Sequence, residues 1–291
     1  MPELPEVETI ARTLACEVES RLILAVEVLD ESAVAPAPEA FRALLLGRRI
    51  ARVGRRGKLL LLHLQASGGK DGGTIAIHLR MTGRVLALGP GEEPVRPRVV
   101  LTLSDRGQGA ARLVFSDVRR FGRMHAFAPP GSPGAIDNWP FYRDLGPEPL
   151  ESTARDFRAR INPCGKRSRA RTARIKALLL DQTVIAGIGN IYADETLFRA
   201  RIRPDAVAGA LSARRLDALF AAIQAVLAQA IAENGSSIRD YRDAFGNAGA
   251  FQNHFQAYGR AGQPCLACGG AMRSLRVAGR TSTFCPRCQT A

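Results

Sequence analysis

The sequence has few acidic residues and no long apolar run. It carries 27 Asp and Glu against 41 Lys and Arg, a formal net charge of +14 over 291 residues. Such an excess predicts a polyanionic partner, because each neutralised phosphate releases condensed counterions. Charge alone leaves an RNA-bound protein open. No apolar stretch approaches the roughly 18–20 residues that span a bilayer, and the acidic N-terminus lacks the features of a signal peptide. We therefore expect a cytoplasmic protein with no membrane segment.

Hydrophobic periodicity divides the chain into two regions. Up to about residue 128, short apolar runs between glycine-rich or charged turns predict a β-sandwich behind a leading helix. After the linker PPGSPG the period becomes helical, and two helices joined by TVIAGIGN resemble a helix–turn–helix variant. The fold class is therefore α+β with two domains. The expected strands are 22–29, 58–64, 74–79, 83–88, 99–103, 111–116 and 122–127, and the expected helices are 172–182, 191–200 and 212–234. The expected divisions are 1–130 for the sandwich, 131–150 for the linker, 151–258 for the helical domain and 259–291 for a cysteine-rich tail.

The tail has the most specific spacing in the chain. Cys265, Cys268, Cys285 and Cys288 form C-x2-C-x16-C-x2-C, which is typical of a four-thiolate zinc ribbon. Disulfides are the alternative, but they are rare in a cytoplasmic chain. The sequence therefore predicts one structural Zn²⁺, with no open coordination position for catalysis.

Two basic segments predict contacts with phosphate. The hairpin between the cysteine pairs carries Arg273, Arg276 and Arg280 and no acid. Residues 157–176 hold eight Lys and Arg and no acid, and they lead into the first helix of the helical pair. For both segments the alternative is a solvated charged surface.

Two turns carry further candidates. Asn190 stands where a helix begins, so it either caps that helix, which local sequence favours, or contacts a phosphate. Arg119 and Phe121 in DVRRFGRMH lie two apart and face the same way in an extended segment, which suits a wedge into a base stack. A buried Phe beside a surface Arg is the interpretation that local sequence favours. His78 and Met81 in IHLRMTG indicate little by themselves, because a lone Met is usually a core residue and a lone His is usually a surface or capping residue.

The first residues suit covalent chemistry. Removal of the initiator Met would leave Pro2 with a secondary amine that titrates near pH 8, so part of it is neutral and nucleophilic. Attack on a sugar C1′ would give a cationic iminium, which favours elimination. Glu3 could shuttle the proton, provided that burial near Glu6 raises its pKa. The alternative is an ordinary helix start, with Pro5 and the acids at the positive end of the helix dipole.

Six features occur together and in order over nearly the whole chain: MPELPEVET, KLLL after an arginine pair, HLRMTG, RRFG, GIGNIYADE and the four-cysteine ribbon. In combination they resemble the bacterial formamidopyrimidine-DNA glycosylases, base-excision enzymes that remove oxidised purines such as 8-oxoguanine. The resemblance implies a β-sandwich domain, a helix–two-turn–helix module and a zinc ribbon. It also implies double-stranded damaged DNA as the partner, a monomer, and a cytoplasmic, nucleoid-associated bacterial protein.

The resemblance also implies roles for individual residues. Pro2 is the nucleophile on C1′, Glu3 protonates the deoxyribose ring oxygen, and Glu6 supports them; β- and δ-elimination then follow. Lys58, counted with the catalytic residues, matches a phosphate-binding position. The other implied DNA contacts are His78, Asn190 and Arg280 on phosphates, and Met81, Arg119 and Phe121 in the space left by the extruded base. For Phe121 and Met81 this reverses the local interpretation.

The chain departs from the family pattern at a few positions. Arg80 stands where the family usually has a small residue, Val118 replaces a proline, and the loop around SGGKDGG is longer than usual. Residues 237–255 align with a variable lesion-sensing loop. Two rivals stay open: an endonuclease VIII-like glycosylase for oxidised pyrimidines, and a non-catalytic zinc-ribbon protein that binds DNA or RNA.

Overall fold

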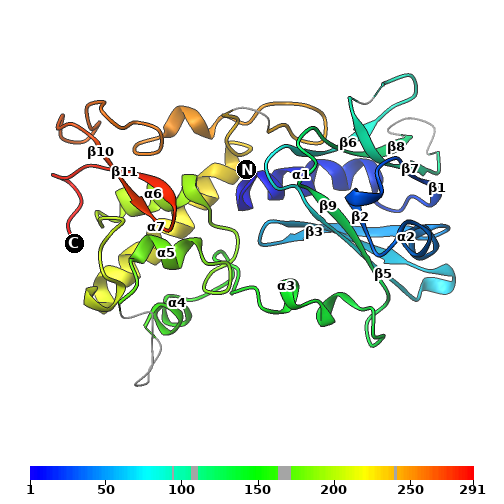
Figure 1. The fold of residues 1–291 in the computed structure, drawn as a ribbon, viewed down its shortest axis with the longest axis horizontal. Helices are drawn as coiled ribbons and strands as arrows, with labels where there is room; N and C mark the ends of the chain where they lie inside the picture. The colour runs from blue at the N-terminus through cyan, green and yellow to red at the C-terminus, as the bar shows by residue number, and fades with distance from the viewer. Residues whose placement is uncertain (94, 106–110, 163–171, 239–240) are drawn as a thin grey trace. The chain divides into compact units, whose positions relative to one another are not determined.

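The computed structural model describes residues 1–93, 95–105, 111–162, 172–238 and 241–291 (Figure 1). The chain forms two compact units. The first comprises Met1–Asp144 together with Glu233–Ala250, and the second comprises Leu145–Ala232 together with Phe251–Ala291. The segment Glu233–Ala250, which the sequence-based division assigned to the helical domain, is thus part of the first unit.

The first unit contains two sheets. Their strand orders are β1-β7-β8-β6 and β2-β9-β5-β4-β3, and only the short β2–β9 pairing is parallel among the described strands. One hydrophobic core takes side chains from both sheets and from the leading helix, as a sandwich requires. The elements are α1 (Leu4–Val18), β1 (Ile23–Val28), β2 (Val34–Ala35), α2 (Pro38–Leu45), β3 (Arg49–Arg56), β4 (Leu59–Gln65), β5 (Asp71–His78), β6 (Gly83–Leu88), β7 (Pro97–Leu103), β8 (Arg112–Asp117), β9 (Arg123–Phe127) and α3 (Pro140–Arg143).

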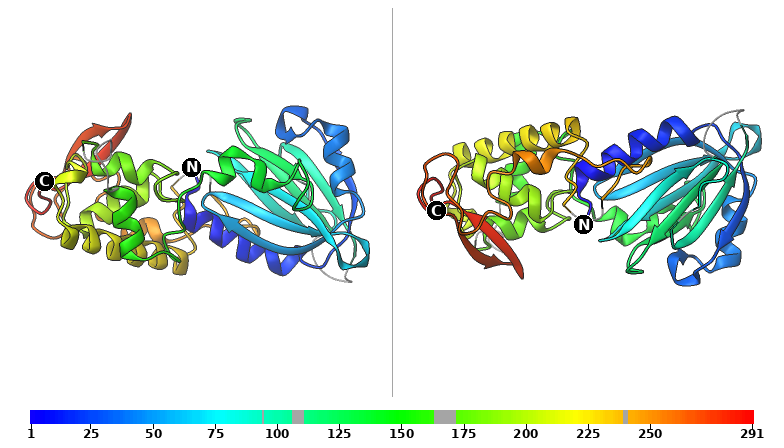
Figure 2. Two further views of the ribbon diagram at one scale, coloured as in Figure 1. Left: turned by 90° about the horizontal axis from the view of Figure 1, so that it is seen from below. Right: turned by 90° about the horizontal axis from the view of Figure 1, so that it is seen from above.

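Helix α1 lies along one side of the strands (Figure 2). Val7, Ile10, Leu14 and Val18 recur at helical spacing and are fully or almost fully buried. Burial of each such side chain stabilises the fold by about 1.5–3 kcal/mol. On its polar side, Glu8 accepts a 2.8 Å hydrogen bond from Nε of Arg55 on β3. The helix that presents the N-terminal residues is therefore fixed to the sandwich on two sides.

The second unit is mainly helical. Its elements are α4 (Ala154–Ile161), α5 (Ile175–Leu180), α6 (Asn190–Arg199), α7 (Ala213–Ala232), β10 (Arg273–Val277) and β11 (Arg280–Phe284). Helix α4 begins at a capping box in which Thr153 and Asp156 bond each other's backbone N–H groups. Helix α5 is shorter than the helix expected over 172–182. Residues 172–174 before it and 181–182 after it are not helical.

Helix α7 corrects one statement drawn from the sequence. It has 20 residues, and an 18-residue window within it has a mean hydropathy of 1.4, so by length and composition the helix is apolar enough to cross a bilayer. Half of that window is buried within the protein, however, and Phe220 stacks on Phe157 of α4 with ring centroids 5.2 Å apart. Burial against α4 and α6 is what the core helix of a globular unit shows.

Candidate active site and nucleic-acid interface

The N-terminal residues form a buried, hydrogen-bonded group. Pro2, Glu3 and Glu6 are all buried, and the two carboxylates are 3% and 1% exposed. The Glu3 backbone N–H donates to Oε2 of Glu6 at 2.8 Å, and the Ser236 backbone N–H donates to Oε1 at 2.7 Å. Both Glu6 oxygens therefore accept charge-assisted hydrogen bonds, which fix the backbone beside Pro2.

The segment that supplies Ser236 fits closely around Glu6. Gly235 has φ +78°, and a Cβ there would come within 2.9 Å of Oε1 of Glu6, so a side chain has no room. The hydroxyl of Tyr241 donates to the Asn234 carbonyl at 3.1 Å. Burial and then the charge of Glu6 raise the pKa of Tyr241 well above its usual range. The contact between Glu6 and Ser236 joins residues 230 positions apart, and no local pattern predicts it. Residues 239–240 of the predicted lesion-sensing loop lie outside the described residues.

Lys58 directly precedes β4 and His78 ends the neighbouring strand β5, so both lie at the same end of the larger sheet. Lys58 occupies a two-residue turn between β3 and β4, where Gly57 has φ +55°, and its neighbour Leu59 pairs with His78. Burial, followed by the charges of Arg80 and Lys58, lowers the pKa of His78 to about 3. Nδ1 of His78 accepts the Arg80 backbone N–H at 3.1 Å, so the neutral ring presents Nε2–H as a donor.

Met81, Arg119 and Phe121 come together on the surface of the first unit. The Arg119 guanidinium lies 4.9 Å from the centroid of the Phe121 ring and 3.4 Å from Sδ of Met81. Phe121 is 53% exposed and Met81 is 43% exposed. The local interpretation of Phe121 and Met81 as core residues is therefore wrong. An exposed aromatic ring held by an arginine is suited to enter a base stack.

A buried aspartate, which sequence reasoning missed, organises this group. Asp117 is 2% exposed and accepts hydrogen bonds from the Arg119 backbone N–H at 3.1 Å and the Gly122 backbone N–H at 2.6 Å. It also accepts the Thr82 hydroxyl at 2.5 Å, from the turn that carries Met81. One carboxylate thus holds both loops in place. Its position directly before VRRFG was the only available signal.

In the second unit, Asn190 and the β10–β11 hairpin are joined. Nδ2 of Asn190 donates to the Thr281 carbonyl at 3.0 Å, next to the exposed Arg280. Gly189, not Asn190, is the N-cap of α6. Within the described part of the chain, Oδ1 of Asn190 is buried without a hydrogen-bond partner. Asn190 therefore links helix and hairpin, and the interpretation as a helix cap alone is wrong.

Two carboxylates of α6 bind the region around the hairpin. Oδ1 of Asp194 pairs with Nζ of Lys176 at 2.6 Å, and Oδ2 accepts the Thr283 backbone N–H at 3.0 Å. Burial raises the pKa of Asp194 to about 6, although Lys176 opposes the shift. Glu195 accepts three backbone N–H groups, from residues 256, 257 and 258, at 2.8–2.9 Å. The Asp and Glu of GIGNIYADE thus anchor the chain just before the tail and at its hairpin.

Several basic side chains of the run 157–176 are buried or form contacts within the protein. Lys176 is fully buried, so its expected contact with phosphate is wrong. Arg158 pairs with Asp217, and Arg160 donates to the Thr183 carbonyl at 3.2 Å. Residues 163–171, which carry four of the eight basic side chains and Cys164, lie outside the described residues.

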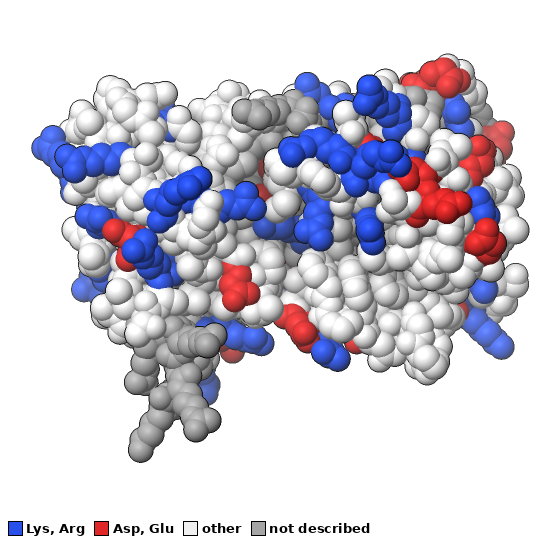
Figure 3. Space-filling view, viewed as in Figure 1, with Lys and Arg blue, Asp and Glu red and all other residues white. Residues whose placement is uncertain are grey.

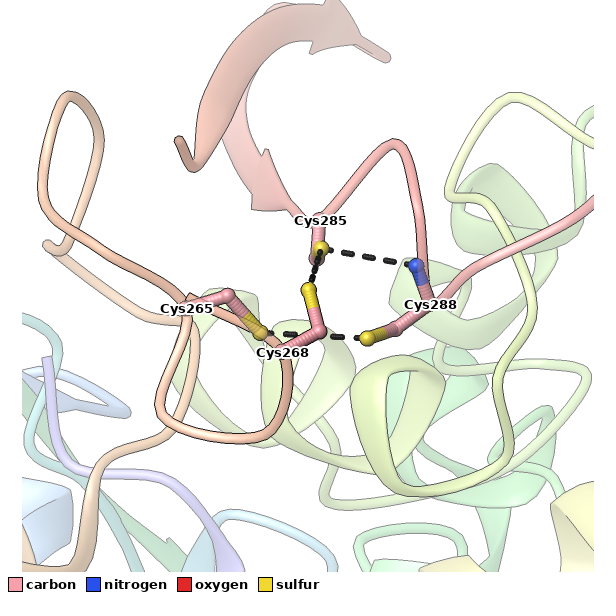
Figure 4. A group of neighbouring side chains, drawn as sticks. All are labelled: Cys265, Cys268, Cys285 and Cys288. Carbon is pink, nitrogen blue, oxygen red and sulfur yellow. Dashed lines mark hydrogen bonds between the residues drawn. The ribbon is translucent and has the colours of Figure 1, made fainter. Parts of the chain in front are cut away.

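The four tail cysteines converge on one point (Figure 4). The sulfurs of Cys268 and Cys285 lie 3.5 Å apart, those of Cys265 and Cys288 lie 3.9 Å apart, and all four lie within 4.8 Å of one another. A tetrahedral ion with Zn–S bonds of about 2.3 Å requires sulfurs about 3.8 Å apart. None of the cysteines in the described ranges forms a disulfide. The cluster therefore fits one zinc ion.

Positive charge marks the surface of each unit. Lys and Arg side chains gather on the faces shown in Figure 3, where Asp and Glu side chains are fewer. Arg119 is exposed in the first unit, and Arg273, Arg276 and Arg280 are exposed in the second. Both surfaces therefore suit phosphate.

Comparisons with known proteins agree over the whole chain. Residues 1–124 match the formamidopyrimidine-DNA glycosylase N-terminal domain, 145–242 match the H2TH domain of that glycosylase, and 262–291 match a zinc finger found in FPG and IleRS. A formamidopyrimidine-DNA glycosylase of Chloroflexus aggregans is 47% identical over 99% of this chain and 98% of its own length. The chain belongs to the formamidopyrimidine-DNA glycosylase family.

Solved structures of the family extend the agreement to three dimensions. The MutM (FPG) protein of Thermus thermophilus is 38% identical with a TM-score of 0.82, covering 99% of this chain and 98% of that one. The Lactococcus lactis Fpg, solved in a complex with an abasic site containing DNA, is 32% identical with a TM-score of 0.83, covering 99% of this chain and 100% of that one.

Membership of the glycosylase family confirms three predictions. The fold is the expected two-domain α+β arrangement, the protein is an enzyme, and the tail holds one structural zinc. The non-catalytic rival is therefore wrong. The roles of individual residues stay predictions.

Proposed function

We propose that this chain is a bifunctional DNA glycosylase and AP lyase that removes oxidised purines, such as 8-oxoguanine and formamidopyrimidines, from double-stranded DNA in base-excision repair. Full-length membership of the glycosylase family supports the reaction class. The observation that carries the mechanism is the buried group of Pro2, Glu3 and Glu6, in which Glu6 accepts the backbone N–H groups of Glu3 and Ser236.

The reaction begins once Met1 is removed and Pro2 has a free secondary amine. Its nitrogen lone pair forms a bond to C1′, and the bond from C1′ to the base breaks, with its electron pair and a proton going to the base. Glu3 then donates its proton to the ring oxygen O4′ as the C1′–O4′ bond breaks. The product is a cationic iminium between Pro2 and the open sugar.

Two eliminations follow from the iminium. Loss of the C2′ proton expels the 3′ phosphate, and loss of the C4′ proton expels the 5′ phosphate, so the strand is cut on both sides of the lesion. Water then hydrolyses the iminium and restores the amine. The carboxylate of Glu3 is the nearest candidate to move these protons, while Glu6 remains a positioning residue.

The remaining predicted residues bind and deform DNA in this proposal. Lys58 and the Nε2–H of neutral His78 donate to phosphate, which their adjacent positions on β3–β4 and β5 support. Asn190 and Arg280 hold a second phosphate, supported by the bond from Asn190 to Thr281. Met81, Arg119 and Phe121 fill the space left by the extruded base; their mutual contacts and exposure support this role. The enzyme acts as a monomer at the bacterial nucleoid, in the cytoplasm.

Borohydride trapping tests the proposal. Purified protein is mixed with a duplex that carries 8-oxoguanine opposite cytosine, and a matched duplex carries an oxidised thymine. We expect a covalent adduct on the first duplex, because borohydride reduces the iminium to a stable amine. An adduct on the second duplex alone would move the chain to the endonuclease VIII-like group. No adduct on either, from protein shown to lack Met1, would contradict the mechanism.

A further inference from the structure

Arg80 occupies a position that the backbone does not favour for arginine. It follows His78 and Leu79 at the end of β5, it is exposed, and its φ is +55°. This left-handed region suits glycine and strains a residue with a Cβ. Among the residues that the structure describes, no carboxylate pairs with the Arg80 guanidinium. The fold therefore gains no ion pair in return for the strained residue.

Arg80 lies near other hydrogen-bond donors. Its backbone N–H fixes Nδ1 of His78, which leaves Nε2–H of that ring as a donor. The charge of Arg80 lowers the pKa of His78 after the larger effect of burial, and that of His125 after the larger effects of burial and of Arg123. Lys58 also acts on His78. The positive charges of the exposed Arg80 and the largely buried Lys58 therefore both act on one neutral imidazole.

We propose that Arg80 binds a backbone phosphate of the DNA next to the phosphate assigned to Lys58 and His78. The inference rests on the proposed function and deepens it. A guanidinium presents two parallel N–H groups to phosphate oxygens and keeps its charge at any physiological pH. Arg80 also directly precedes Met81, which enters the duplex in the proposed function.

Salt dependence of binding tests this assignment without any chemistry. The probe is a fluorescent duplex with a tetrahydrofuran abasic analogue, and affinity is measured by anisotropy over a series of NaCl concentrations. The variant Arg80→Gly removes the charge and relieves the positive φ, so we expect it to fold. Arg96→Gly is a matched control, because Arg96 is also exposed and has φ +50°.

Each phosphate contact contributes about 0.9 to the slope of log K against log salt. We expect Arg80→Gly to reduce the slope by about that amount and to weaken binding about equally whatever the sequence, whereas Arg96→Gly keeps the wild-type slope. An unchanged slope in Arg80→Gly, or an equal change in the control, would overturn the assignment. So would a loss that depends only on the base opposite the lesion, because Arg80 would then contact a base. Failure of the proposed chemistry would appear separately, as wild-type protein that binds but traps no DNA.

Discussion

The two units hold their functional residues in different ways. In the first unit, Glu6 and Asp117 are buried carboxylates that accept backbone N–H groups from helix and loop ends. In the second unit, Glu195 and Asp194 also accept backbone N–H groups, Asp194 is paired with a buried lysine, and a cluster of four cysteines holds a metal. Both units thus use buried carboxylates that accept backbone N–H groups, and the second unit adds a fully buried pair of Lys176 and Asp194 and a zinc site. The units should therefore respond differently to chelation, charge removal and pH.

Removal of zinc should produce the largest difference between the units. Structural zinc sites contribute about 10–16 kcal/mol of apparent binding free energy, so a chelator should unfold the tail and displace Arg280. The β-sheets of the first unit should remain. Circular dichroism would follow the strands, and anisotropy would follow DNA affinity, with Cys285→Ser as a second route to the same loss. Unchanged DNA affinity without zinc would show that the hairpin does not bind DNA.

Asp194→Asn should have the next largest effect. It leaves Lys176 buried without its counter-charge, which costs about 3–5 kcal/mol in the free energy of unfolding. The matched control is Asp205→Asn in the same unit, because Asp205 forms a partly exposed pair with Arg203 and should contribute about 0–1 kcal/mol. Urea unfolding of both variants gives the two values. Equal losses would mean that burial does not decide the strength of the pair.

Acid should weaken the first unit through His78. Its pKa is about 3 in the folded protein against about 6.5 unfolded, so between these values the unfolded chain binds a proton that the folded chain does not. The contribution of this group to the free energy of unfolding is therefore complete above about pH 6.5. As the pH decreases below that value, the contribution decreases by up to about 1.4 kcal/mol per pH unit. His78→Asn retains an acceptor for the Arg80 N–H and should remove this part of the pH dependence. An identical pH profile for both proteins would contradict the neutral ring.

Phe121→Ala should have the smallest effect on stability and a clear effect on DNA. The ring is 53% exposed, so the free energy of unfolding should change by less than about 0.5 kcal/mol. Excision of 8-oxoguanine should fall, because the wedge is absent. Thermal unfolding and single-turnover excision, measured on the same preparation, separate the two. A large loss of stability would mean that Phe121 packs in the core, and would contradict its role as an exposed wedge.

The sequence predicted features that are local. The four-cysteine spacing and the leading helix α1 lie within short windows, where ligand spacing and periodicity carry the information. The sequence also predicted Asn190, though local rules gave it the wrong partner. A capping position looks the same in sequence whether its side chain caps the helix or reaches a hairpin 91 residues away.

The features missed are non-local. Glu6 meets Ser236, and Glu195 meets residues 256–258, only because the chain returns to pack there. Phe121 was misjudged from its neighbours because an apolar residue after a strand usually turns inward. Its exposure depends on the loop conformation that Asp117 fixes by accepting the backbone N–H groups of Arg119 and Gly122. Such contacts need the fold, or a family resemblance, to be seen.

The central claim is that the amine of Pro2 attacks the damaged nucleotide. The most direct measurement is mass spectrometry of the borohydride-trapped complex after digestion of protein and DNA, with Met1 removal quantified in the same sample. The account predicts that the sugar remnant is on the N-terminal peptide at Pro2, in a yield that follows the fraction of chains without Met1. A remnant on a lysine, or trapping that is independent of Met1 removal, would contradict it.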